Sequence, residues 1–154
     1  MQLSPSTDIA LRAVMRLAGG DADGGRVTIG IIAGQVGASP RHVGKAIARL
    51  TAMGLVTAQR GRTGGLTLTP AGRAVRLGAL VRDLEDDREV VECVGDHPCP
   101  LIAACRLRRA LAEASAAFYA ELDRYTVADL VAGPAGRLLQ LLAHPRAGAG
   151  TTEE

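Results

Sequence analysis

The sequence contains no long apolar run and no start typical of an exported protein. Nowhere in its 154 residues do roughly 18 uncharged apolar residues follow one another, as a transmembrane helix requires. The first residues, MQLSPSTDIALRAVMRL, lack a basic segment followed by an apolar one, which is the pattern of a secretory signal. We therefore expect a soluble, cytoplasmic protein that has no membrane partner.

Acidic residues are missing from the segment between residues 26 and 82. This segment has nine basic residues and no Asp or Glu: Arg26, Arg41, Lys45, Arg49, Arg60, Arg62, Arg73, Arg76 and Arg82. A block of one charge sign favours a polyanionic partner, although a basic surface is often only a solvated face. From residue 83 onward the balance reverses, with 13 acidic against seven basic residues. The chain is therefore expected to divide near residue 82.

Patterns of enzyme active sites are missing as well. No Ser/His/Asp or Cys/His catalytic set is visible, and the phosphate-binding spacing G-x4-GK-[ST] is absent. We predict that the protein is not an enzyme.

What the basic segment does contain is a predicted pair of short helices joined by a tight turn. Thr28 can cap the first helix and Gly37 ends it, whereas Ser39, followed by a proline, begins the second. In a helix-turn-helix, the second helix enters the major groove with its N-terminal residues at the base edges. The first helix is expected to contain the apolar residues Ile31, Ile32 and Val36. The DNA contacts of the second are expected at Ser39, Arg41, His42, Lys45 and Arg49.

A β-hairpin is predicted next, with strands over residues 55–58 and 66–69. Its turn, rich in glycine and arginine, can bend tightly, approach phosphates and reach a minor groove. A hairpin directly after a helix-turn-helix is typical of the wing of a winged helix. We expect wing contacts to DNA at Arg60, Gly61, Arg62, Gly64 and Gly65. The alternative is an ordinary flexible hairpin with solvated arginines.

Further helices are predicted at residues 5–17, 70–82, 100–125 and 127–131, and from residue 134 onward. Segment 100–125 repeats apolar residues at intervals of three and four, and as one helix it would extend roughly 35 Å. Since a small winged domain cannot cover this length, we predict a homodimer, which would bind an inverted-repeat operator in double-stranded DNA. The alternative is that the apolar stripe packs within its own chain. The predicted fold is mainly α, a winged helix-turn-helix domain with a two-stranded wing and a long dimerisation helix.

The three cysteines, Cys93, Cys99 and Cys105, are separated from one another by five residues each and follow an acidic stretch. An odd number of thiols cannot complete a disulfide framework, and a reducing cytoplasm keeps thiols free. Three thiolates can converge on a metal or an iron–sulfur cluster. The rival is zinc with His97 as fourth ligand, although gaps of five exceed the spacing usual in structural zinc sites.

Together these features resemble a family of winged-helix iron–sulfur regulators that includes NsrR, IscR and RirA. The resemblance covers roughly residues 1–130 and rests on the opening STDIALRAVMRLA, the helix-turn-helix, the wing RGRTGGLTLTPAG and three cysteines before a long helix. IscR-like members have a histidine where this chain has Arg108 and a base-reading acid where it has Gly44. His42 and Lys45 match the His-x-x-Lys pattern of NsrR, so the chain is most similar to that group.

The resemblance implies a dimeric repressor that senses nitric oxide through an iron–sulfur cluster, most simply 4Fe-4S, held by the three cysteines. In NsrR-like proteins an aspartate from the other subunit completes the ligand set, and the matching residue is Asp8. From the sequence alone, an acid in a first helical turn is usually a dipole stabiliser. Nitric oxide would release the repressor from genes of nitric oxide detoxification. A RirA- or IscR-like sensor of iron or cluster status is one alternative. A small iron–sulfur electron carrier, from another class, has no use for the basic block.

The resulting division of the chain has four parts. Residues 1–82 form the DNA-binding domain and residues 83–100 the cluster-binding loop. Residues 101–143 contain the dimerisation helix and a C-terminal helical segment, and residues 144–154 are predicted to be a disordered tail.

Overall fold

The computed structural model describes residues 2–20, 26–59, 61, 64–87, 89–95 and 97–143. Helices dominate these residues, and the one sheet they contain is antiparallel and two-stranded, which confirms the predicted fold class. In chain order the elements are α1 (Pro5–Gly19), α2 (Ile29–Val36), α3 (Pro40–Ala52), β1 (Val56–Ala58), β2 (Leu66–Leu68), α4 (Pro70–Ala74), α5 (Leu77–Leu84), α6 (Arg106–Leu122), α7 (Val127–Leu130) and α8 (Pro134–Ala143).

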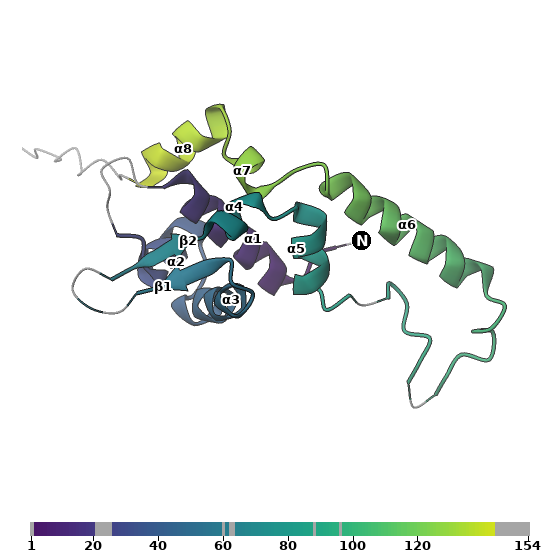
Figure 1. Ribbon diagram of the computed structural model, residues 1–154. Helices are drawn as coiled ribbons and strands as arrows, with labels where there is room; N and C mark the ends of the chain where they lie inside the picture. The colour runs from purple at the N-terminus through teal and green to yellow at the C-terminus, as the bar shows by residue number, and fades with distance from the viewer. Residues whose placement is uncertain are drawn as a thin grey trace, which may run out of the picture.

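The molecule has a compact part and a projecting part (Figure 1). The compact part, here called the body, consists of α1 to α5 with both strands, and of α7 and α8 beside α1. Residues 85–118, here called the arm, comprise the loop after α5 and most of α6, and they extend away from the body. None of the described helices is both long enough and apolar enough to cross a bilayer.

Local capping explains where the first three helices begin. The Ser4, Thr28 and Ser39 hydroxyls each accept a hydrogen bond from a backbone N–H three residues onward, which satisfies a donor that the helix leaves open. Gly37, with φ of 68°, makes the turn from α2 to α3 in a left-handed conformation that glycine adopts without strain. These signals confirm the predicted helix-turn-helix.

The core of the body lies where α1, α3 and α5 meet the hairpin. Val14, Leu50 and Leu80 are fully buried there, and burying each such side chain contributes about 1.5–3 kcal/mol. In α2, Ile32 is fully buried, whereas Ile31 is 40% exposed, because a short helix packed on one side turns neighbouring residues to different faces.

The hairpin is shorter than predicted but keeps its register. Val56 pairs with Leu68 and Ala58 pairs with Leu66. β1 begins one residue later and β2 ends one residue earlier than predicted, because Leu55 and Thr69 lie at the junctions to α3 and α4. There Thr69 N–H and Oγ1–H both donate to Leu55 O, and Thr69 Oγ1 accepts from Gly72 N–H.

The prediction of a single helix over residues 70–82 is wrong, because the segment forms two helices, α4 and α5. Val75 is extended, with ψ of 135°, and its carbonyl accepts from Val127 N–H. Leu77 N–H donates to Tyr125 O on the other side of this short pairing. The chain leaves the helical conformation at this point because its backbone bonds to the segment before α7.

The long helix predicted over residues 100–125 is also shorter, because α6 begins at Arg106 and ends at Leu122. Residues 100–104 form turns, and Cys105 caps the helix. At 1.5 Å per residue, α6 extends about 25 Å. Of its side chains only Tyr119 is buried, near the end that packs on α5, while Leu107 is 63% exposed.

Candidate DNA-binding face and cysteine loop

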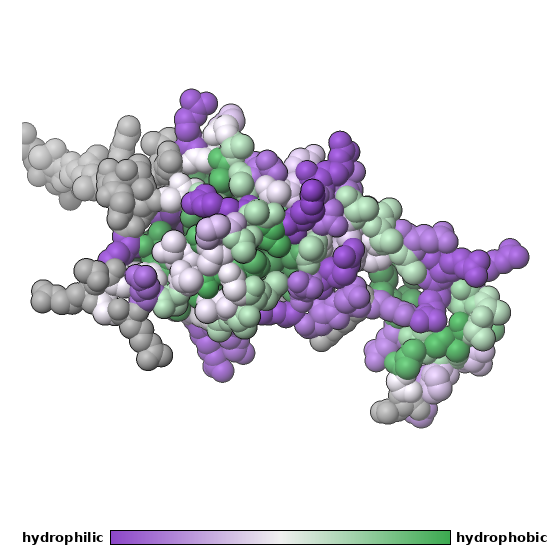
Figure 2. All heavy atoms as spheres, viewed as in Figure 1, coloured by the Kyte–Doolittle hydropathy of each residue, from purple (hydrophilic) through white to green (hydrophobic). Residues whose placement is uncertain are grey.

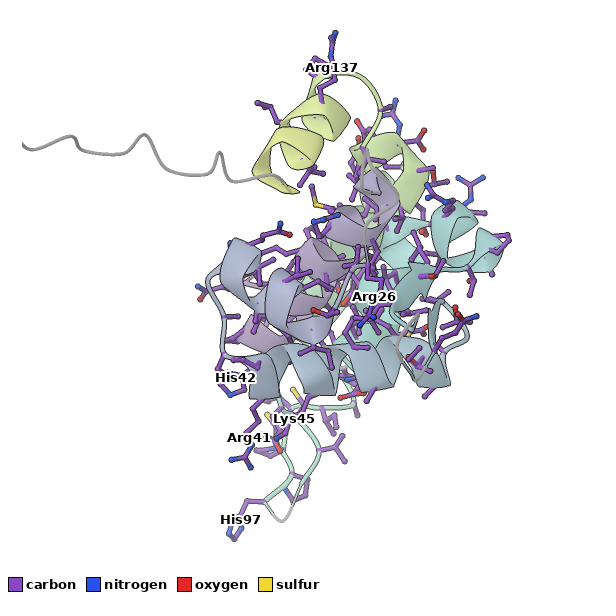
Figure 3. All side chains as sticks on the ribbon, turned by 90° about the vertical axis from the view of Figure 1, so that its left-hand side faces the viewer. Arg26, Arg41, His42, Lys45, His97 and Arg137 are labelled. Atoms are coloured by element: carbon purple, nitrogen blue, oxygen red, sulfur yellow. The ribbon has the colours of Figure 1, made fainter. Side chains whose placement is uncertain are left out.

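Three basic side chains of α3 form an exposed group. Arg41, His42 and Lys45 project from the same side of the helix and away from the body (Figure 3). The Ser39 hydroxyl, expected at the DNA, accepts from His42 N–H at 3.3 Å and so holds the first turn of α3. The first turn of the recognition helix is therefore ordered and its cations are accessible, as a major-groove contact requires.

Arg49, the fifth residue expected to contact DNA, is half-buried and bonds to the start of the arm. Its guanidinium donates to the backbone carbonyl of Asp83 and to the carboxylate of Asp86. Arg49 therefore connects the recognition helix to the segment that leads to the cysteines. A DNA contact by Arg49 stays a prediction.

The base of the wing is anchored to the body by backbone hydrogen bonds. Gln59 N–H donates to Gly65 O at 2.9 Å, and Leu66 N–H donates to Val27 O at 2.8 Å. Gly61 has φ of 107°, a conformation that favours glycine, and Gly64 N–H donates to its carbonyl at 3.0 Å. Arg60 and Arg62 lie outside the described residues, so their contacts to DNA stay predictions.

The three cysteines are free thiols, each partly exposed, in the loop of the arm. Cys99 N–H donates to Cys93 O at 3.1 Å, and Cys105 Sγ accepts from Arg108 N–H at 3.4 Å. Within the part of the chain that the structure describes, no three His, Cys, Asp or Glu side chains lie close enough to hold a metal ion. The donor set suits an iron–sulfur cluster or zinc, but one chain alone does not gather it.

The two other proposed ligands lie elsewhere. His97 is at the tip of the loop and points away from the rest of the molecule (Figure 3). Asp8 is on α1 and pairs with Arg12 one helical turn later, with Nε and Oδ1 2.9 Å apart and about half of each side chain exposed. Asp8 is thus accessible, and binding to a metal would compete with this ion pair.

The start of the arm is bonded to two helices of the body. Besides the Arg49 contacts, Glu85 Oε1 accepts from Ser4 N–H at 2.9 Å, which connects the end of α5 to the start of α1. Asp86 and Asp87 both have positive φ, 57° and 49°, which is uncommon outside glycine and tolerated better by Asp than by most residues. In the sequence these residues are only members of an acidic run, so no pattern marks them as connectors.

An ion pair joins the two ends of the cysteine loop. The guanidinium of Arg108 donates to both carboxylate oxygens of Glu89. These hydrogen bonds hold the pKa of Glu89 below its ordinary value. They also raise the pKa of Arg108, with a smaller contribution from negative charge at Cys93 and Cys105. The position that sets this chain apart from IscR-like proteins is therefore part of the cysteine loop's own structure.

Comparison with known proteins places these features in a family. The family model Rrf2, described as an iron-dependent transcriptional regulator, matches residues 3–133. The HTH-type transcriptional repressor NsrR of Streptomyces coelicolor is 54% identical over 139 residues, which are 90% of this chain and 94% of that protein.

Two solved structures share the fold. Staphylococcus aureus CymR in its oxidised form superposes with a TM-score of 0.65 at 23% identity, over 86% of this chain and 98% of that one. IscR of T. potens superposes with a TM-score of 0.64 at 22% identity, over 85% of this chain and 86% of that one. The match of family model, sequence and fold over nearly the whole winged domain and arm shows that this chain belongs to the Rrf2 family of transcriptional regulators.

Proposed function

We propose that this protein is a dimeric, cytoplasmic repressor that senses nitric oxide through an iron–sulfur cluster and controls genes of nitric oxide detoxification. The similarity to the transcriptional repressor NsrR supports the repressor function. The resemblance to NsrR-like regulators implies nitric oxide as the signal. One structural observation carries the mechanism. The loop with the three cysteines begins at residues bonded both to the recognition helix, through Arg49, and to the start of α1, through Glu85.

The DNA-binding part of the proposal rests on exposed cations. Arg41, His42 and Lys45 point away from the body along one side of α3 (Figure 3), and strand β1 of the hairpin packs beside the same helix. In a two-fold dimer, two such faces would meet the two halves of an inverted repeat. Figure 2 shows an apolar area on the arm, far from the body. Among the residues of the arm, Val94, Leu101 and Leu107 are each more than half exposed, as expected for residues that a second subunit covers.

For the cofactor, we propose Cys93, Cys99 and Cys105 as ligands, with Asp8 of the other subunit as the fourth and 4Fe-4S as the cluster type. Such a cluster would supply one iron without a protein thiolate, at which small molecules could react. Asp8 would have to leave Arg12 in order to bind, and in doing so it would connect α1 of one subunit to the arm of the other. Zinc with His97 is favoured less, since His97 points away from the molecule.

The proposed switch follows from these connections. Cys93, Cys99 and Cys105 of the arm and Asp8 on α1 of the partner would hold the cluster jointly and so connect the two subunits, and the arm is bonded to the recognition helix at Arg49. Losing the cluster would release this link and change the spacing of the two recognition helices. A rigid-body shift of this kind is a common form of switching in dimers.

The deciding experiment is anaerobic. Freshly purified protein should contain iron and acid-labile sulfide in near-equal amounts, and the binding of an inverted-repeat duplex should weaken when nitric oxide bleaches its visible spectrum. Replacing any one cysteine by serine should abolish cluster retention, while His97→Ala should leave it unchanged. Zinc without sulfide, or metal lost in His97→Ala, would contradict the cluster.

A second candidate signal is iron itself, because the family is described as iron-dependent. The two signals, iron and nitric oxide, can be distinguished with an iron chelator. It is applied at a concentration that leaves a nitric-oxide-sensitive cluster intact. Release from DNA by the chelator alone would favour iron sensing, and release by nitric oxide alone would favour the proposal above.

Mixed dimers test Asp8. A dimer of one Asp8→Ala chain and one chain with all three cysteines replaced would hold one native-like cluster if Asp8 binds across the dimer. Both defects then fall at one site. If Asp8 bound within its own chain, both sites would be damaged and no native-like cluster would form.

A further inference from the structure

The feature that carries a further inference is the ion pair between Glu89 and Arg108. Glu89 precedes Cys93 by four residues, and Arg108 follows Cys105 by three, so the pair closes the whole cysteine segment into a loop. Arg108 Nε lies 2.8 Å from Glu89 Oε2, and Nη2 bonds to Oε1. Two parallel bonds between a planar guanidinium and a carboxylate fix orientation as well as distance.

The pair also lies close to the first and the last cysteine. Two adjacent open hollows, of about 440 Å³ and 430 Å³, flank it: Cys93 lines one, Cys105 lines the other, and Glu89 lines both. Arg108 contacts Cys105 directly, because its backbone N–H donates to Sγ. Its guanidinium is also close enough to Cys93 and Cys105 for thiolate charge at either to act on it.

Packing within one chain does not set the spacing of these cysteines. Among residues 85–118 that the structure describes, no side chain is buried. Besides the backbone bond from Cys99 N–H to Cys93 O, a polar contact between the loop ends can therefore hold them together before a partner or cofactor binds. It removes freedom that a loop of this length would otherwise have to lose on assembling a site.

We propose that Glu89 and Arg108 form a clasp that sets the separation of Cys93 and Cys105, with Arg108 as the cation beside their thiolates. Both are positioning residues. Three thiolates gathered at one site repel one another, and a neighbouring guanidinium, which keeps its charge at any physiological pH, lowers that cost. The cation's effect on a bound cluster rests on the proposed function, whereas the spacing of the thiols does not.

The spacing is tested in metal-free full-length protein. In a Cys99→Ser background, a short reagent with two alkylating groups can bridge Cys93 to Cys105, and mass spectrometry gives the bridged fraction within single chains. Glu89→Gln and Arg108→Gln should each lower this fraction several-fold. Reversing the pair, Glu89→Arg with Arg108→Glu, should restore it. Arg109→Gln, which removes the same charge one residue away, is the matched control and should not change it.

Salt gives a second readout, since an exposed ion pair is screened at high ionic strength. High salt should lower the bridged fraction of the Cys99→Ser parent and leave that of Arg108→Gln unchanged. Equal bridging in the parent, both single variants and the reversed pair would overturn the clasp.

The cofactor half is tested separately, in protein with all three cysteines. Under a chelator, Arg108→Gln should lose iron and sulfide several-fold faster than the unsubstituted protein or Arg109→Gln. Equal rates would overturn the role of Arg108 at the cluster. If the unsubstituted protein held no iron and sulfide at all, the proposed function would fail, while the bridging result would still decide the clasp.

Discussion

The body and the arm are held in place by different interactions. The body has a continuous apolar core in which Val14, Leu50 and Leu80 are fully buried. In the described part of the arm no side chain is buried, and the contact that joins the ends of its loop is the ion pair of Glu89 with Arg108. The apolar core therefore stabilises the body, whereas the arm has no such core of its own among the residues that the structure describes. That difference suits a sensor, because the less stable part is the part a signal can change.

The largest expected effect is a difference in stability between a leucine-to-alanine substitution in the body and one in the arm. Leu50→Ala removes a fully buried side chain of α3 and should lower the free energy of unfolding by about 2–5 kcal/mol. Leu107→Ala removes a side chain that is 63% exposed on the arm and should change it by less than about 0.5 kcal/mol. Denaturant unfolding of dilute protein measures both. Leu107→Ala should instead weaken dimerisation in sedimentation. Similar losses of stability would mean that the two regions do not differ as described.

A second pair concerns space inside the body. A Cβ at Gly72 would lie 2.2 Å from Leu55 O, so Gly72→Ala must displace the junction of hairpin and α4 and should cost about 1–3 kcal/mol. At Gly34 in α2 nothing lies within 4 Å of an added Cβ, and alanine there should stabilise the protein by about 0.5–1 kcal/mol. Thermal unfolding should shift in opposite directions. A neutral Gly72→Ala would show that the junction is loosely packed.

Arg49 tests the connection between the two regions. If it transmits the state of the arm, Arg49→Ala should bring the DNA affinities of cluster-bound and cluster-free protein closer together, reducing a coupling that is typically about 1–3 kcal/mol. Arg41→Ala should weaken DNA binding in both states by a similar amount, because Arg41 is exposed on α3 and points away from the body. Duplex titrations of both forms measure the difference. An equal loss in both states for Arg49→Ala would assign Arg49 to DNA contact, as its position on the helix first indicated.

The smallest effect is a pH dependence within the body. Thr126 donates its N–H and hydroxyl to Asp129, and these bonds hold the pKa of Asp129 below its ordinary value of 3.8. A carboxylate with a lowered pKa stabilises the fold above its ordinary pKa and loses that contribution as pH falls through the lowered value. The stability difference between the unsubstituted protein and Asp129→Asn should thus be constant from pH 7 to pH 5 and shrink below 3.8. A difference independent of pH down to acid unfolding would contradict this role.

Much of the body could be predicted because its signals are local. Ser39 and the proline after it begin α3 by satisfying open donors within one turn, and Gly37 makes the preceding turn through its own backbone freedom. The break between α4 and α5 could not be predicted in this way. It depends on Val75 bonding to Val127, more than fifty residues later, and no pattern near Val75 records that partner.

For the site, the sequence alone determined which residue types are available: three cysteines in one loop, cations on a recognition helix and an acid at Asp8. Only the tertiary structure decided how they are connected. It bonded Arg49 to Asp86, paired Asp8 with Arg12, and closed the cysteine loop with Glu89 and Arg108. The physical reason is that a residue's chemistry is carried by its own side chain, whereas the partner of a charged side chain is set by the folding of distant segments.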